Sequence, residues 1–124
     1  MSRRHHSLLQ SFQFAFAGLS FFFRTQRNAR IHLVLGLIAC ALGIWLRISR
    51  LEWLMLMFAI TGVMILEGVN TAIETVVDLA CPEIHPLAKQ AKDLAAAMVL
   101  LASIAAMVVG LMILGPPLWE KLRG

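Results

Sequence analysis

The stretch 94–114 contains no charged side chain, and Ser103 is its only hydroxyl-bearing residue. A helix needs about 20 consecutive apolar residues to cross the hydrocarbon core of a bilayer. The many alanines of this stretch also suit close packing against other helices in a membrane. It therefore predicts a membrane-spanning helix, and Gly115-Pro116-Pro117 predicts where that helix ends.

Two further segments have the same character. The segment 31–46 is uncharged apart from His32, and the segment 49–79 begins with the S-x-x-E pattern of a helix cap. A helix of about 30 residues is about 45 Å long, so the second of these must emerge from a hydrocarbon core of about 30 Å. With 60% hydrophobic residues in 124, we expect a single membrane-embedded domain over 1–124. Its predicted fold class is an all-α membrane protein with three transmembrane helices.

The N-terminal segment 7–23 is apolar but interrupted by glutamines and serines. We expect it to form an amphipathic helix on the cytoplasmic surface of the membrane, with its phenylalanines in the lipid. The alternative is a signal peptide, because Arg3 and Arg4 precede an apolar stretch. No small-x-small cleavage site follows, and arginines close the segment instead, which favours the surface helix.

The basic residues are divided unequally between the two sides of the predicted membrane. Seven of the 11 Lys and Arg residues fall in the N-terminal segment or beside the turn 81–86, and cytoplasmic loops carry such an excess. We therefore expect the N terminus and this turn to lie in the cytoplasm, where ATP is available. The seven residues are Arg3, Arg4, Arg24, Arg27, Arg30, Lys89 and Lys92.

The net charge of +4 does not indicate nucleic-acid binding, because the basic residues flank apolar runs as membrane topology requires. Cys40 and Cys81 form no C-x-x-C or zinc-binding spacing. We expect both to be free, buried thiols.

Four polar residues share one stripe of the second predicted helix. Glu67, Asn70, Glu74 and Asp78 are spaced i, i+3, i+7 and i+11, so they lie on one helix face. Polar side chains at membrane depth are costly unless they face protein or water. The stripe therefore predicts a functional site, although its outer members also fit a solvated helix end.

Carboxylates beside a lysine suit a divalent cation and phosphate. Mg²⁺ binds to one or two carboxylates together with water and phosphate oxygens. Lys92 could neutralise phosphate charge, and a remaining carboxylate could act as a base toward a hydroxyl group. The sequence contains no GxxxxGK[ST] or GxGxxG loop, so helix side chains must form any nucleotide site.

The stripe resembles a known family signature. The run 67–78, Glu-Gly-Val-Asn-Thr-Ala-Ile-Glu-Thr-Val-Val-Asp, is similar to E-x-x-N-[ST]-A-I-E-x-x-V-D of the small prokaryotic diacylglycerol kinase and undecaprenol kinase family. The run 91–97, Ala-Lys-Asp-Leu-Ala-Ala-Ala, resembles the A-K-D segment of that family. The runs 11–19 and 27–32 resemble its N-terminal helix and the entry to its first spanning helix, so the resemblance covers about residues 11–115.

The resemblance implies a fold and an activity. Members of the family have three transmembrane helices and an N-terminal surface helix, and form homotrimers with active sites shared between subunits. They transfer the γ-phosphoryl group of MgATP to the hydroxyl group of a lipid in the bacterial inner membrane. By motif position, Glu67 resembles the catalytic base and Glu74 a metal ligand. Four further residues match positions that support the nucleotide and the metal in the family, namely Asn70, Asp78, Lys92 and Asp93. Glu83 and His85 fall in the loop that contacts ATP in the family.

The sequence departs from the family pattern near its N terminus. Gln26 stands where the family commonly has a second metal-binding Glu. Gln13 and Phe14 stand where Lys and Tyr are common, and that Tyr contacts the nucleotide. The resemblance therefore implies a metal position at Gln26 and a nucleotide position at Phe14, both with altered side chains.

Two functions compete at this point. The first is an ATP-dependent kinase of diacylglycerol or undecaprenol, and the run 27–32 looks more like the undecaprenol kinase branch. The second is a small proton-coupled transporter that uses Glu67 as its titrating group. The transporter accounts for Glu67 but not for Glu74, Asp78 and the Lys-Asp pair at 92–93.

Overall fold

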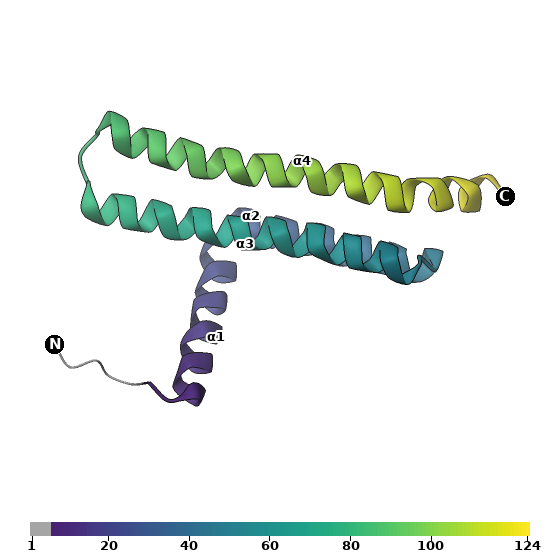
Figure 1. Cartoon of the computed structure of the whole chain (residues 1–124), viewed down its shortest axis with the longest axis horizontal. Helices are drawn as coiled ribbons and strands as arrows, with labels where there is room; N and C mark the ends of the chain where they lie inside the picture. Colours follow the sequence, from purple (N-terminus) through teal and green to yellow (C-terminus); the bar gives the residue numbers. More distant parts are fainter. Residues whose placement is uncertain (1–5) are drawn as a thin grey trace.

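The computed structural model describes residues 6–124, and these form four helices and no strand. The helices are α1 (Leu8–Thr25), α2 (Arg27–Leu46), α3 (Arg50–Ala80) and α4 (Pro86–Arg123). Figure 1 shows α3 and α4 side by side as an antiparallel hairpin, with α2 along α3 and α1 projecting away from the other three helices at a steep angle. Arg3 and Arg4, part of the predicted basic N terminus, lie outside the described residues.

Three of these helices are long and apolar enough to cross a membrane, namely α2, α3 and α4. This confirms the predicted number and approximate position of the spanning helices. The helix α1 is not among them, and none of its residues is buried. It begins with a capping box, in which the Ser7 hydroxyl oxygen accepts from the Gln10 backbone N–H.

The connection between α2 and α3 is tight at both ends. At the end of α2, Arg47 adopts the left-handed conformation with φ of 54°, and its N–H donates to carbonyls of the last turn. At the start of α3, the Glu52 N–H donates to Ser49 Oγ at 3.2 Å, and Ser49 N–H donates to Glu52 Oε1 at 3.1 Å. The predicted capping box is therefore confirmed.

Glycine lets α2 approach α3 closely. A Cβ added at Gly43 would lie 2.9 Å from the Trp53 ring, and one added at Gly36 would lie 3.0 Å from Ile60. Such distances leave no room for a larger residue without a shift of the neighbouring side chain. Both glycines are buried, and they fix the contact between the two helices.

The predicted end of the last helix is wrong. We expected Gly115-Pro116-Pro117 to stop it, but α4 continues through both prolines to Arg123. Proline removes a backbone donor, yet neighbouring helices allow it within membrane helices. Here Lys121 Nζ donates to the Trp45 carbonyl oxygen at 3.2 Å and lies 4.5 Å from the centre of the Trp45 ring. These contacts attach the final turns of α4 to the end of α2.

The buried core is small and lies at the end of the bundle away from the α3–α4 turn. Leu56, Ile113 and Leu114 form its centre. Most large apolar side chains on the described part of the chain are exposed, including Phe58 at 79% and Met112 at 73%. Because the exposure of such an apolar surface to water is unfavourable, lipid or further subunits must cover it. Cys40 and Cys81 are free thiols, and both are half-buried rather than buried as we expected.

Candidate active site

The deepest polar residue of the described chain is Glu67, which is only 3% exposed. It lies on α3, where the buried residues Leu56 and Val63 precede it on the same helix face. The predicted polar stripe is therefore the continuation of the apolar stripe that faces the other helices. A buried carboxylate is costly unless it has a partner.

The partner of Glu67 comes from α2. His32 Nε2 lies 3.7 Å from Glu67 Oε2, and the His32 side chain is 24% exposed against 4% for Glu67. This distance is long for a direct hydrogen bond but within the range of an ion pair. Sequence reasoning did not pair His32 with Glu67, because a contact between positions 32 and 67 leaves no local signal.

One turn further along α3, Asn70 contacts Glu74. Asn70 Nδ2 donates to Glu74 Oε1 at 3.5 Å. The Asn70 amide oxygen is buried, and within residues 6–124 it has no hydrogen-bond partner. Since buried polar atoms normally have partners, this orphaned oxygen is an acceptor that a bound ligand would satisfy. Together the two residues present hard oxygen atoms of the kind that Mg²⁺ prefers.

The outer end of the stripe joins α3 to α4. Lys92 Nζ on α4 forms an ion pair with Asp78 Oδ1 on α3. Asp93 points elsewhere, because its carboxylate pairs with Lys89 of its own helix at 2.5 Å. The structure therefore brings Lys92, but not Asp93, directly to the predicted carboxylate stripe.

The remaining predicted residues lie apart from this stripe. Gln26 separates α1 from α2, and its Nε2 donates to Thr25 Oγ1 at 3.3 Å. Phe14 is 60% exposed. Glu83 is exposed in the turn and accepts from the Cys81 thiol at 3.4 Å. His85 caps α4, because its Nδ1 accepts from the Leu87 N–H at 3.1 Å.

No complete metal site exists among the described side chains. No three His, Cys, Asp or Glu side chains between residues 6 and 124 are grouped to hold a metal ion. Mg²⁺ commonly keeps several water ligands and is held by one or two carboxylates together with substrate phosphates. The Glu74 carboxylate and the unpaired Asn70 amide oxygen fit that kind of site, in which the nucleotide would supply the other ligands.

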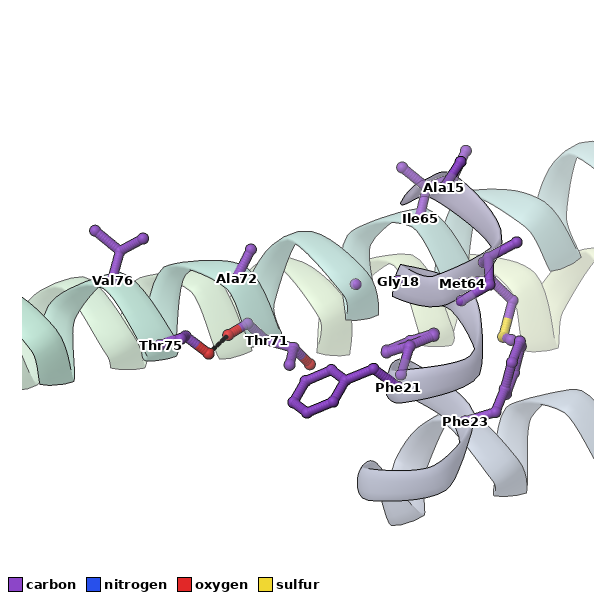
Figure 2. A pocket seen from close by; sticks show the side chains of 13 residues that line it. Ala15, Gly18, Phe21, Phe23, Met64, Ile65, Thr71, Ala72, Thr75 and Val76 are labelled. Atoms are coloured by element: carbon purple, nitrogen blue, oxygen red, sulfur yellow. Dashed lines mark hydrogen bonds between the residues drawn. The ribbon is translucent and has the colours of Figure 1, made fainter. Parts of the chain in front are cut away.

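An apolar groove lies between α1 and α3. Its volume is about 580 Å³, and Figure 2 shows α1 residues on one wall and α3 residues on the other. Glu67 itself does not line the groove, but Met64 and Thr71 do, and these lie three positions before and four positions after it on the helix. Three of the phenylalanines that we expected to enter lipid form part of a groove wall instead, namely Phe21, Phe22 and Phe23.

A second cavity of about 460 Å³ lies between α2, α3 and α4. His32 lines it, together with Ile60 and Val63 of the buried face of α3. It is predominantly apolar along its length. His32 therefore borders this cavity and also lies 3.7 Å from the Glu67 carboxylate.

The chain is similar to known lipid kinases over most of its length. The family model described as prokaryotic diacylglycerol kinase matches residues 13–114. A diacylglycerol kinase of Synechocystis is 48% identical over 113 residues, which cover 90% of this chain and 65% of that relative. An undecaprenol kinase of Bacillus subtilis is 39% identical over 95 residues, which cover 77% of each chain.

The diacylglycerol kinase of Escherichia coli is also similar, with 39% identity over 72 residues that cover 58% of this chain and 59% of that relative. The family match includes the whole stripe on α3 and the lysine that pairs with it on α4. Relatives with both substrate names therefore share the segment that forms the candidate site. By this match, and by three helices able to span a membrane, the chain belongs to the prokaryotic diacylglycerol kinase family.

Proposed function

We propose that this protein is a membrane lipid kinase that transfers the γ-phosphoryl group of ATP to the hydroxyl group of a lipid alcohol. The observation that carries the proposal is the buried Glu67 carboxylate on the helix that also presents Glu74 and Asp78. The family membership and the names of the relatives support the same activity. The transporter alternative gains no support from the comparisons.

In the proposed reaction Glu67 is the general base. Its carboxylate accepts the proton of the lipid hydroxyl as the hydroxyl oxygen attacks the γ-phosphorus. The bond from the γ-phosphorus to the bridging oxygen breaks, and ADP leaves with that oxygen. The position of Glu67 fits this role because its surroundings exclude most water, which would otherwise compete for the phosphoryl group.

The nucleotide is proposed to bind at the outer end of the stripe. Glu74 would hold Mg²⁺, with Asn70 beside it and Gln26 as the second protein position of the family pattern. When bound, this cation would neutralise phosphate charge. Lys92 offers a positive charge to the phosphates, and Asp78 orients it. Four residues outside the stripe remain proposed nucleotide contacts, namely Asp93, Glu83, His85 and Phe14. These side chains would have to move toward the stripe when ATP binds.

The lipid alcohol is proposed to enter through the apolar groove between α1 and α3. The groove can take a hydrocarbon tail (Figure 2), and Met64 and Thr71 on its α3 wall lie about one helical turn from Glu67. Its apolar lining does not distinguish an acyl tail from an isoprenoid tail. Both diacylglycerol and undecaprenol therefore stay candidate substrates, as the names of the relatives also suggest.

We further propose a homotrimer in the bacterial inner membrane, with α1 on the cytoplasmic surface and the N terminus in the cytoplasm. The exposed apolar side chains of the spanning helices support contacts with lipid and with other subunits. The exposed apolar residues and the serines and glutamines of α1 support a position at the interface. The unequal distribution of Lys and Arg supports the orientation.

A direct assay tests the proposed function. The full chain, purified in detergent micelles with Mg²⁺ and ATP, should phosphorylate an added lipid alcohol, with the phospholipid product identified by mass. Diacylglycerol and undecaprenol are assayed in parallel at equal mole fraction. ATP consumption without a lipid product, or proton flux into vesicles in the absence of ATP, would contradict the kinase proposal.

A further inference from the structure

We propose that His32 is a positioning residue for Glu67, and that an imidazole N–H holds one carboxylate oxygen while the other faces the lipid hydroxyl. This inference rests on the proposed function of Glu67 as the base. The starting observation is the 3.7 Å separation between His32 Nε2 and Glu67 Oε2. Such contacts are often long without substrate and shorten in the reactive complex.

The backbone of α2 fixes the direction of the His32 side chain. Ala29, Gly36 and Gly43 are the buried residues of α2, and His32 shares their helix face through the spacing i, i+3, i+7 and i+14. Ala29 is 0% exposed, and Gly36 contacts Ile60 of α3 closely. Because these neighbours pack within the bundle, His32 is directed toward α3 and not toward lipid.

Apart from His32, no charged group around Glu67 among the residues that the structure describes is placed to orient its carboxylate. In the described part of the chain, His32 is the only basic side chain within ion-pair distance of Glu67. On α3 itself, the nearest carboxylate of the stripe, Glu74, contacts Asn70, and on α4 Lys92 is paired with Asp78. The segment of α1 beside the groove contributes apolar side chains.

A hydrogen-bond donor that orients the carboxylate matters because the accepting oxygen of a general base must point at the hydroxyl proton that it removes. A carboxylate has two equivalent oxygens and rotates about its last torsion unless a contact holds it. A neutral imidazole with its proton on Nε2, or an imidazolium, offers one N–H to one oxygen. The second oxygen then remains free to accept the proton. Misplacing a reacting group by about 1 Å costs about 10²-fold in rate.

The test compares His32→Ala, which removes the donor, with His32→Gln, which keeps an N–H at a similar reach. We expect His32→Ala to lower kcat about 10- to 100-fold while the KM for MgATP stays within about twofold. His32→Gln should recover most of the lost kcat. Leu37→Ala, on an exposed face of the same helix, serves as the matched control and should keep the activity of the wild type.

A double variant separates this inference from the function on which it rests. If His32 acts through Glu67, adding His32→Ala to Glu67→Gln should cause no further loss of kcat. Near-normal kcat in His32→Ala, or equal losses in His32→Ala and His32→Gln with a matching rise in KM, would overturn the positioning role. If Glu67→Gln is itself fully active, the proposed base is wrong, and that result is distinct from a failure at His32.

Discussion

The two ends of the polar stripe on α3 have opposite environments. At one end Glu67 is 3% exposed and faces an imidazole across the bundle. At the other end Asp78 is exposed and pairs with Lys92 near the α3–α4 turn. The two residues are 11 positions apart in the sequence, which corresponds to about 16 Å along the helix. In the proposed reaction, the buried end would hold the lipid hydroxyl group and the exposed end would hold the nucleotide, whose γ-phosphoryl group would have to extend along the stripe to Glu67.

The largest expected effect lies at the buried end. Glu67→Gln keeps the size of the side chain but removes its ability to accept a proton, so kcat should fall about 10²- to 10⁴-fold. The rate of lipid phosphorylation in micelles measures kcat. Glu120→Gln, on the exposed end of α4, is the control for the loss of a carboxylate. If Glu67→Gln turns over at nearly the rate of the wild type, Glu67 is not the general base, and the two ends of the stripe do not differ in function as proposed.

A different effect is expected in the middle of the stripe. Glu74→Gln should raise the Mg²⁺ concentration for half-maximal activity by about 10-fold or more, because a neutral amide is a poorer ligand for a hard cation than a carboxylate. A Mg²⁺ titration at fixed ATP and lipid measures it. If the Mg²⁺ response is unchanged, Glu74 does not hold the metal.

At the exposed end the expected effect concerns ATP. Lys92→Met removes the charge that faces the phosphates, so the KM for ATP should rise about 10-fold, in line with the loss of one charged hydrogen bond. Lys89→Met, on the same helix but paired with Asp93, is the matched control. Thermal stability should change little in both variants, because exposed ion pairs contribute little to folding. Equal effects of the two variants on KM would argue against a specific role for Lys92.

The smallest expected effect is that of a substitution at the α1–α2 junction. Gln26→Glu adds a carboxylate beside Arg24 and Arg27, and it should lower the Mg²⁺ requirement by about two- to fivefold if Gln26 approaches the nucleotide. Lipid preference should stay the same. An unchanged or weakened response to Mg²⁺ would place Gln26 away from the metal, where its present hydrogen bond to Thr25 already holds it.

The features that follow from local spacing could be predicted from the sequence. The cap at Ser49 and Glu52, the stripe that begins at Glu67 and the number of spanning helices depend on neighbours within a few turns. Two features depend on contacts between helices and were not predictable in this way. Lys121 and Trp45 attach the final turns of α4 beyond its prolines, and His32 meets Glu67 across the bundle.

The central claim is that Glu67 performs chemistry and Glu74 binds the nucleotide with its metal. The most direct measurement is the equilibrium affinity for ATP, at one fixed Mg²⁺ concentration, of Glu67→Gln and Glu74→Gln beside the wild type. We predict that Glu67→Gln binds ATP within about twofold of the wild type, whereas Glu74→Gln binds about 10-fold more weakly. The reverse result, with weak binding by Glu67→Gln and normal binding by Glu74→Gln, would contradict the division of roles along α3.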